Sequence, residues 1–259
     1  MSTIAITRDV SPSINNCELS FHSRKPIDLA KAVAQHNSYR QCLEQLGAHV
    51  VRLPAERGFP DSVFVEDAAV VFDELAVIPV MGAASRRDEI KTIIPALCPY
   101  RELEYLHAPA TLDGGDVLRA GKRVFVGLSN RTNEAGFIQL RSILQKYGYA
   151  VDAVRLRHVL HLKSAVSYVG DSTVLINRAW LAGSAFAEFQ SLEVPDTESA
   201  AANVLSLNGT IIIAKSFPDT AERLEQKGFS IRTVDVSELQ KAEAGVTCCS
   251  LILSATSRT

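Results

Sequence analysis

The chain has 259 residues, of which 47% are hydrophobic and 22% charged, and its formal net charge is -2. This is the balance of a globular protein with a sizeable core, and it excludes a global charge bias toward nucleic acid or an anionic membrane. No stretch reaches the roughly 20 apolar residues that span a bilayer. We therefore expect neither a nucleic-acid nor a membrane partner.

The cysteines and the first residues indicate the compartment. Residues 1–10 contain Arg8 and Asp9 and lack the apolar centre of a signal peptide. The five cysteines are odd in number and include no C-x-x-C pair. Adjacent cysteines such as Cys248 and Cys249 form only strained disulfides with each other. We expect free thiols, a reducing cytoplasmic compartment, and neither a metal nor an organic cofactor.

In chain order, the apolar periodicity predicts a strand, a helix and a strand, followed by four units of strand, turn, strand, helix and strand. The strongest turn signal is Asn208-Gly209 in the fourth unit. The helix after it begins at Pro218 and ends at Gly228. The predicted elements are strand 4–7, helix 28–46 and strand 48–53; hairpin 68–80, helix 85–97 and strand 101–106; hairpin 116–128, helix 131–147 and strand 149–156; hairpin 164–177, a helix from about Ala179 and strand 191–194; hairpin 204–215, helix 218–227 and strand 229–236; and a last strand, 247–253.

The first three of these hairpins start 48 residues apart, at positions 68, 116 and 164. A repeat of this period is typical of circular or solenoid architectures. The last strand, joined to the N-terminal elements, completes a fifth unit. We predict one α/β domain, residues 1–259, a five-unit ββαβ α/β propeller closed by pairing of the N- and C-terminal segments. The alternative is an open, doubly wound α/β sheet.

Two acidic clusters precede predicted hairpins. Asp61, Glu66 and Asp67 surround the apolar residues 63–65, and Asp113 lies beside a Gly-Gly pair. Buried carboxylates are costly unless a cation meets them. The clusters therefore indicate either a pocket for a cationic substrate or solvated turns.

Residues at equivalent places in the repeat should face the same central opening. Of six histidines, His161 stands before its hairpin as Asp113 stands before the preceding one. Cys248 and Cys249 lie at the start of the last predicted strand, where only one of them can face the opening. Arg86 and Arg131 are placed near the starts of predicted helices, where the helix dipole does not favour a cation. They are either solvent-exposed or a clamp for a carboxylate.

Taken together, these segments resemble the dimethylarginine dimethylaminohydrolase family of guanidine-modifying enzymes, whose fold is a five-unit α/β propeller. The resemblance covers nearly the whole chain, and the six segments that carry it occur in family order. They are FVED at 64–67, SRR at 85–87, LDGGD at 112–116, FVGLSNRT at 125–132, LHLKS at 160–164 and TCCS at 247–250.

The resemblance implies a role for each candidate residue. Cys248 is the expected nucleophile, His161 the general acid and base, and Asp113 its carboxylate partner, where some members carry glutamate. The remaining candidates are expected to bind substrate: Leu19, Asp61, Glu66, Asp67, Arg86 and Arg131. The match at Leu19 rests on its distance from Asp28, since the flanking residues differ.

The activity implied is hydrolysis of N-methylated arginine to citrulline and dimethylamine or methylamine. Three alternatives stay open: an arginine deiminase, which usually carries a helical insertion; an amidinotransferase, which is also typically longer; and a non-catalytic protein that binds arginine-like ligands. The sequence does not decide whether two copies form a homodimer.

Overall fold

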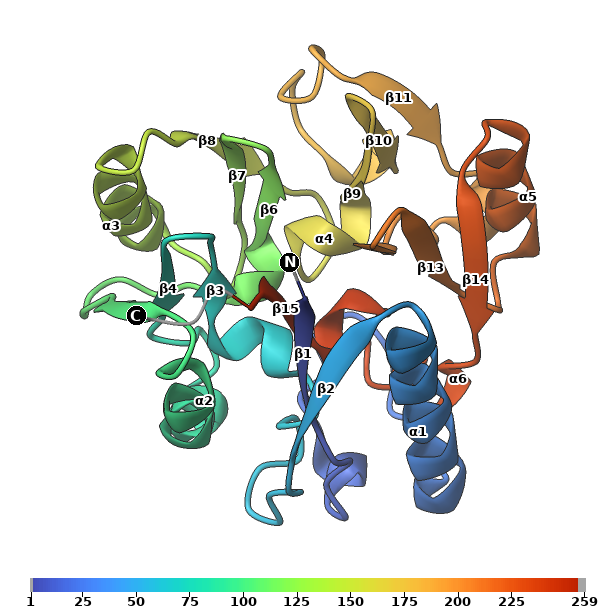
Figure 1. Ribbon diagram of the computed structural model, residues 1–259, viewed down its shortest axis with the longest axis horizontal. Coiled ribbons are helices and arrows are strands. Elements are labelled where there is room, and N and C mark those ends of the chain that lie inside the picture. The colour runs from blue at the N-terminus through green and yellow to red at the C-terminus, as the bar shows by residue number, and fades with distance from the viewer. Residues whose placement is uncertain (1, 256–259) are drawn as a thin grey trace.

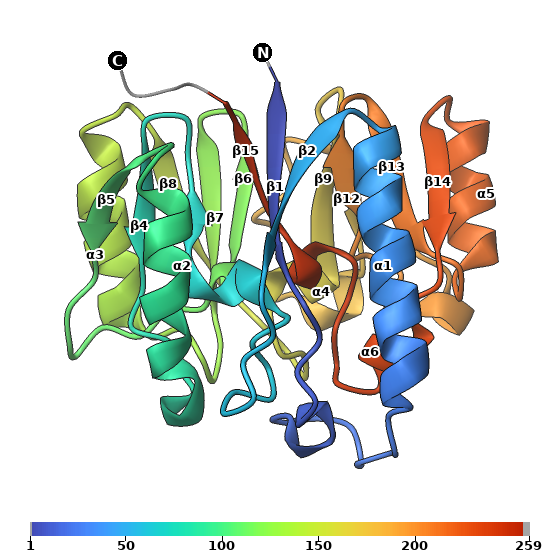
Figure 2. The ribbon, with the colours of Figure 1, turned by 60° about the horizontal axis from the view of Figure 1, so that its bottom comes forward.

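The computed structural model describes residues 2–255, and within them the chain forms five separate three-stranded sheets. Figure 1 shows the sheets arranged like blades around a central axis, and Figure 2 shows α1, α2, α3 and α5 on the outside of the ring. The predicted five-unit propeller is therefore confirmed. No helix among these residues is long and apolar enough to cross a membrane.

One blade combines the two ends of the chain, as predicted. Strand β1 (Thr3–Arg8) pairs in parallel with β2 (Ala48–Leu53) and antiparallel with β15 (Leu251–Ser254), with Ile4 opposite Leu253. Helix α1 (Leu29–Gln45) joins β1 to β2, and the Asp28 carboxylate caps it by accepting the Lys31 N–H at 3.0 Å. The N-terminal strand thus closes the ring onto the last strand.

The other four blades follow one plan: an antiparallel hairpin, a connection, and a third strand parallel to the middle one. Three of the connections contain an α-helix. The blades are β3 (Val70–Val71), β4 (Leu75–Ile78), α2 (Ile90–Leu97) and β5 (Glu102–Tyr105); β6 (Val117–Ala120), β7 (Arg123–Leu128), α3 (Glu134–Gln145) and β8 (Ala150–Arg155); β9 (Val166–Gly170), β10 (Thr173–Ile176) and β11 (Gln190–Glu193); and β12 (Leu205–Leu207), β13 (Thr210–Ala214), α5 (Pro218–Gln226) and β14 (Ser230–Val234).

The third hairpin corrects one prediction. No α-helix follows it, and only a 3-10 turn, η5 (Arg178–Trp180), lies where a helix was expected. Leu181 forms an isolated bridge with Leu156 of the neighbouring connection, which extends the chain there. Phe186 packs on Phe125 with ring centroids 4.6 Å apart. Aromatic contacts between this loop and β7 of the neighbouring blade therefore stand where a helix was expected.

Three other predicted element starts move by three residues or more. Helix α2 begins at Ile90 rather than 85, because Ala84–Glu89 form a 3-10 helix, η3. Helix α3 begins at Glu134 rather than 131, because Asn133 caps it by accepting the Gly136 N–H at 2.8 Å; Arg131 therefore lies in the preceding loop. The predicted last strand begins only at Leu251, since Thr247–Cys249 form a 3-10 turn, η7. The prediction that Cys248 and Cys249 point to opposite faces of a strand is therefore wrong, because neither residue lies in a strand.

The first strands of the blades face the axis. Residues from β3, β6, β9, β12 and β15 line a central channel of about 410 Å³. At one end of this channel, a short turn precedes each of four of these strands: η2 (Val65–Ala68), η4 (Gly114–Asp116), α4 (Leu162–Ala165) and η7. The ring therefore brings these four turns together, although up to 182 residues separate them along the chain.

Candidate active site

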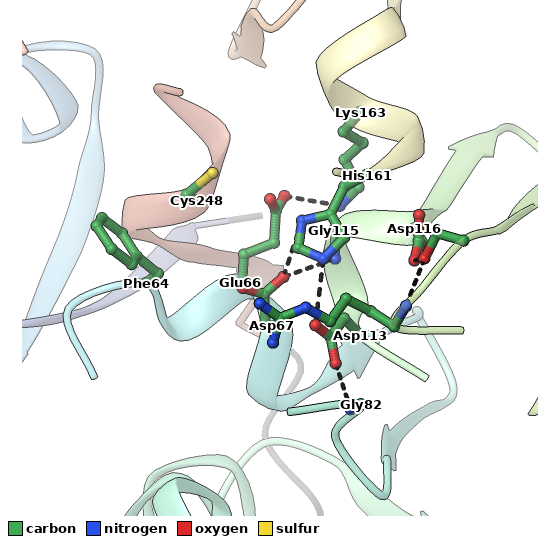
Figure 3. A network of polar contacts seen from close by, with 12 residues as sticks. Phe64, Glu66, Asp67, Gly82, Asp113, Gly115, Asp116, His161, Lys163 and Cys248 are labelled. Carbon is green, nitrogen blue, oxygen red and sulfur yellow. Dashed lines mark hydrogen bonds and ion pairs between the residues drawn. The ribbon is translucent and has the colours of Figure 1, made fainter. Parts of the chain in front are cut away.

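The candidate residues come from equivalent places in the ring. Asp67 lies in η2, Asp113 directly precedes η4, His161 directly precedes α4, and Cys248 lies in η7. Asp67, His161 and Cys248 line one cavity (Figure 3). The repeat thus converts distant sequence positions into one site, as predicted for His161 and Asp113.

Two carboxylates flank the His161 ring. Asp113 Oδ2 lies 3.1 Å from Nε2 of His161, and Asp67 Oδ1 lies 3.8 Å from Nδ1. Asp113 is held in turn by the Gly82 N–H, which donates to its Oδ1 at 2.8 Å. A Cβ at Gly115 would stand 2.7 Å from Nδ1, so glycine is required for the turn to lie against the ring. Asp113 therefore has the geometry of an orienting partner.

The carboxylates determine the charge of His161. Burial disfavours the imidazolium, but Asp67, Asp116 and Asp113 outweigh it and raise the pKa of His161 to about 9. His161 is thus protonated at neutral pH and can act as an acid. Burial likewise opposes ionisation of Asp67, yet the charges of His161 and Arg86 lower the pKa of that carboxyl below its usual value.

Asp116 holds the backbone of the residue that follows His161. Its Oδ1 accepts the Leu162 N–H at 2.9 Å, and its Oδ2 accepts hydroxyls from Ser129 and Thr132 at 2.6 and 2.7 Å. Burial raises the pKa of Asp116 to about 6. Asp116 belongs to the LDGGD segment, but no pattern in that segment separates its role from that of Asp113.

The two adjacent cysteines differ in environment. Cys248 is partly exposed and lines the cavity, whereas Cys249 is 1% exposed and packs in the core. Burial and the charges of Glu66 and Asp67 raise the pKa of Cys248 to about 12. The Gly245 N–H lies 3.3 Å from the sulfur and acts in the opposite direction, because it favours the thiolate. Cys248 is therefore a thiol in the free protein, and a bound cation would promote its ionisation.

The predicted substrate-binding acids lie in different surroundings. Asp61 lines the cavity, and its carboxylate accepts the Glu18 N–H at 3.1 and 3.3 Å. Burial raises the pKa of Asp61. Glu66 instead lines the central channel, where Lys163 Nζ lies 2.6 Å from one oxygen and the Thr247 hydroxyl 2.7 Å from the other. The charge of Glu66 is thus already compensated by Lys163.

The two predicted arginines are also unlike each other. Arg86 is 5% exposed and bound to Asp67 at 2.7 Å and to Glu89 at 2.9 Å. Burial raises the pKa of Glu89 to about 7, which the guanidinium opposes. Arg131 is partly exposed and lines the same cavity, and within residues 2–255 its guanidinium has no hydrogen-bond or ion-pair partner. Arg131 is therefore the cation available to an incoming carboxylate.

A loop covers the cavity and is fixed by carboxylates. Glu243, whose own φ is +61°, accepts the N–H groups of Ser20, Phe21 and His22 at 3.0, 2.6 and 2.5 Å. Leu19 lies in this loop, half-buried against the core, and Glu18 rather than Leu19 lines the cavity. The cavity is about 30 Å³, room for roughly two water molecules. An amino acid can therefore enter only if these walls move.

Sequence reasoning missed several residues of this wall. Glu18, Phe64, Leu160, Ala242, Glu243 and Ala244 all line the cavity. Phe64 and Leu160 lay inside recognised segments, but the others carried no local signal. Asp67, Asp113 and His161 also form a group whose potential metal-ligand atoms lie within 4.8 Å of one another. His161 and Arg86 compensate its two carboxylates, so the group is accounted for without an ion.

A cysteine, a histidine hydrogen-bonded to a carboxylate, and acidic walls beside an arginine that has no partner among residues 2–255 are the groups expected of a thiol hydrolase for a cationic amino acid, here on an α/β propeller. Comparisons with known proteins identify the family. The protein-family model described as "N,N dimethylarginine dimethylhydrolase, eukaryotic" matches residues 4–252 of this chain. The dimethylarginine dimethylaminohydrolase of Pseudomonas aeruginosa is 36% identical over 248 residues, covering 95% of this chain and 97% of that protein.

A second relative and a solved structure agree. The enzyme of the same name from Streptomyces coelicolor is 37% identical over 252 residues, covering 96% of each chain. The structure of a cysteine-to-serine mutant of the Pseudomonas aeruginosa enzyme, complexed with citrulline, matches with a TM-score of 0.92 at 35% identity, covering 98% of this chain and 100% of that one. The chain belongs to the dimethylarginine dimethylaminohydrolase family.

Proposed function

We propose that this protein hydrolyses N-methylated L-arginine to citrulline and dimethylamine or methylamine, with Cys248 as nucleophile. The observation that carries the proposal is that Cys248, Arg131 and His161, the partner of Asp113, line one acidic cavity. The family's named members and the citrulline complex of the Pseudomonas aeruginosa relative support it.

The first half of the reaction uses the substrate's charge. A guanidinium placed between Asp61 and Asp67 favours ionisation of the Cys248 thiol, whose proton goes to solvent because His161 is already protonated. The thiolate attacks the guanidinium carbon and forms a tetrahedral adduct. Imidazolium His161 gives its proton to the methylated nitrogen as the C–N bond breaks, because an amide anion cannot leave at neutral pH. Dimethylamine departs with that proton, and a positively charged thiouronium remains covalently bound to Cys248.

The second half restores the enzyme. Neutral His161 takes a proton from water, the hydroxide attacks the thiouronium carbon, and the C–S bond breaks to return the thiolate. The hydroxyl proton of the resulting urea group is released to solvent, where the amine takes it up. Asp113 keeps the imidazole oriented and stabilises its charged form in both halves. The net reaction is methylated arginine plus water giving citrulline plus amine, and these residues complete it without a metal or an organic cofactor.

Product analysis tests the proposal against the deiminase and binding-protein alternatives. Purified protein with a chelator present is incubated separately with asymmetric dimethylarginine, monomethylarginine and arginine, and citrulline is quantified. We expect citrulline from the methylated substrates and little from arginine. Citrulline mainly from arginine would make the protein a deiminase, and binding without any citrulline would make it a binding protein.

The two arginines predict contrasting variants. Arg131→Ala removes charge-assisted bonds to the substrate carboxylate and should raise KM about 10- to 150-fold, equivalent to roughly 1.5–3 kcal/mol, with little change in thermal stability. Arg86→Met leaves Asp67 and Glu89 buried without their cation. It should lower the free energy of unfolding by about 3–5 kcal/mol. Steady-state kinetics and thermal melts of both variants check this, and a reversed pattern would exchange the two roles.

Two finer expectations are proposals as well, a single domain over residues 1–259 and a cytoplasmic location, and a homodimer is the possible oligomeric state that the sequence left open. Five free thiols, Cys17, Cys42, Cys98, Cys248 and Cys249, support the reducing compartment. Sedimentation equilibrium tests the homodimer, and a monomer at micromolar concentration would exclude it.

A further inference from the structure

Four blades place a catalytic or binding candidate directly before their first strand, and the fifth places Asn203 there, two residues before β12. The Asn203 side chain is buried and satisfies all of its hydrogen-bonding groups. Its Nδ2 donates to Lys163 O at 3.1 Å and to Thr247 Oγ1 at 2.9 Å, and its Oδ1 accepts the Thr247 N–H at 3.1 Å.

These bonds join the two segments that carry the reacting side chains. Lys163 lies in α4, which His161 precedes, and Thr247 begins η7, which contains Cys248. Thr247 Oγ1 donates to Glu66, and Glu66 accepts Lys163 Nζ, so that a ring of contacts runs through Asn203, Thr247, Glu66 and Lys163. Figure 3 shows Glu66 and Lys163 beside His161. These contacts therefore fix the spacing between the segment of His161 and the segment of Cys248, and they lie outside the cavity.

Asn203 also constrains the backbone that faces the sulfur. The backbone of Gly245 lies so close to the amide that a Cβ there would stand 2.2 Å from Asn203 Oδ1. Gly245 N–H is the donor that points at Cys248 Sγ, at 3.3 Å. Displacement of the amide would allow this turn to shift, and the hydrogen bond that favours the thiolate would weaken.

We propose that Asn203 is a positioning residue for the hydrolysis proposed above: it holds the turn of Cys248 against the helix of His161 and aims the Gly245 N–H at the sulfur. Only an amide serves all three contacts. In Asn203→Asp a carboxylate oxygen replaces the donating Nδ2. This oxygen faces two acceptors, the Lys163 carbonyl and the Thr247 hydroxyl oxygen, whose hydrogen is donated to Glu66, so neither hydrogen bond can form. The added negative charge also disfavours the thiolate.

The test compares Asn203→Asp and Asn203→Ser with Asn177→Asp. Asn177 is a matched control, since it is also a buried loop asparagine, donating to Ser199 O at 2.8 Å and accepting the Ala179 N–H at 3.0 Å, and its side chain bonds to neither catalytic segment. The readouts are the melting temperature, kcat and KM, and the rate at which iodoacetamide alkylates Cys248 at pH 9. Fragment mass spectrometry distinguishes alkylation of Cys248 from that of Cys249, and the exposed Cys98 is the internal standard.

We expect Asn203→Asp to lower kcat about 100-fold with KM changed only a few-fold, because misplacing reacting groups by about 1 Å has an effect of this size. Alkylation of Cys248 should slow about tenfold while that of Cys98 is unchanged, corresponding to about one pKa unit. Asn177→Asp should lose stability but keep both rates. If Asn203→Asp does not fold, Asn203→Ser, which retains a smaller polar group, gives the same readouts.

Folded Asn203 variants with the kcat and Cys248 alkylation of the Asn177 control would overturn the proposal. Alkylation needs no substrate, so this arm still decides the role of Asn203 if the wild-type protein forms no citrulline. In that case the proposed function fails, whereas a slowed alkylation of Cys248 would still assign the positioning of the thiol to Asn203.

Discussion

Serine in place of Cys248 is expected to lower kcat by about 10⁴ or more, while methylated arginine still binds. A serine hydroxyl is not ionised near neutral pH, and His161 is protonated there, so no base is available to activate it. The proposed binding groups Asp61 and Arg131 remain in place. Steady-state assays give kcat, and calorimetric titration gives the Kd.

Cys249→Ala is the matched control for that variant. Cys249 is 1% exposed within the core, so truncation should lower the free energy of unfolding by about 1 kcal/mol and leave kcat close to that of the wild type. If Cys249→Ala were inactive but fully folded, and Cys248→Ser active, the nucleophile would be the other sulfur.

The second large effect is expected at Asp113. Asp113→Asn should lower kcat about 10²- to 10⁴-fold, because the imidazole loses its orienting partner and part of the charge that keeps it protonated. The pH profile changes in a defined direction. The pKa of His161 is raised to about 9 by its carboxylates, so the acid form is lost as pH rises through 9. Removing one carboxylate lowers this pKa and moves the alkaline limb to lower pH.

Asp113→Glu separates charge from geometry. It keeps the negative charge beside His161, so its alkaline limb should stay near that of the wild type even if kcat falls. The kcat/KM profile between pH 6 and 11 is measured for both variants. An unshifted limb in Asp113→Asn would mean that another group than His161 controls it.

Much of the fold could be predicted because its signals are local. Alternating apolar strands, Asn208-Gly209, and the Pro218 and Gly228 boundaries each encode one blade segment. The absence of an α-helix from the segment after Asn177 could not be predicted in this way. Its sequence permits a helix start, but the packing of Phe186 on Phe125 and the bridge from Leu181 to Leu156 are long-range contacts that stabilise an extended loop instead.

The site was predictable where the repeat constrained it. His161 and Asp113 are 48 residues apart and meet as equivalent positions of adjacent blades. The choice between Cys248 and Cys249 was not available from a strand pattern, because these residues form a 3-10 turn. Asn203 and Glu243 form hydrogen bonds with residues 40 to 223 positions away in sequence, and neither lies in a segment with a local chemical signature.

The most direct test of the account is the mass of the peptide that carries Cys248 after acid quenching during turnover. Thiouronium formation at Cys248 predicts an adduct equal to the substrate minus its methylated amine, identical for dimethyl- and monomethylarginine, and located on Cys248 by fragmentation. An adduct on Cys249, or one that keeps the methyl groups because ammonia has left instead, would contradict the assigned nucleophile or the assigned leaving group.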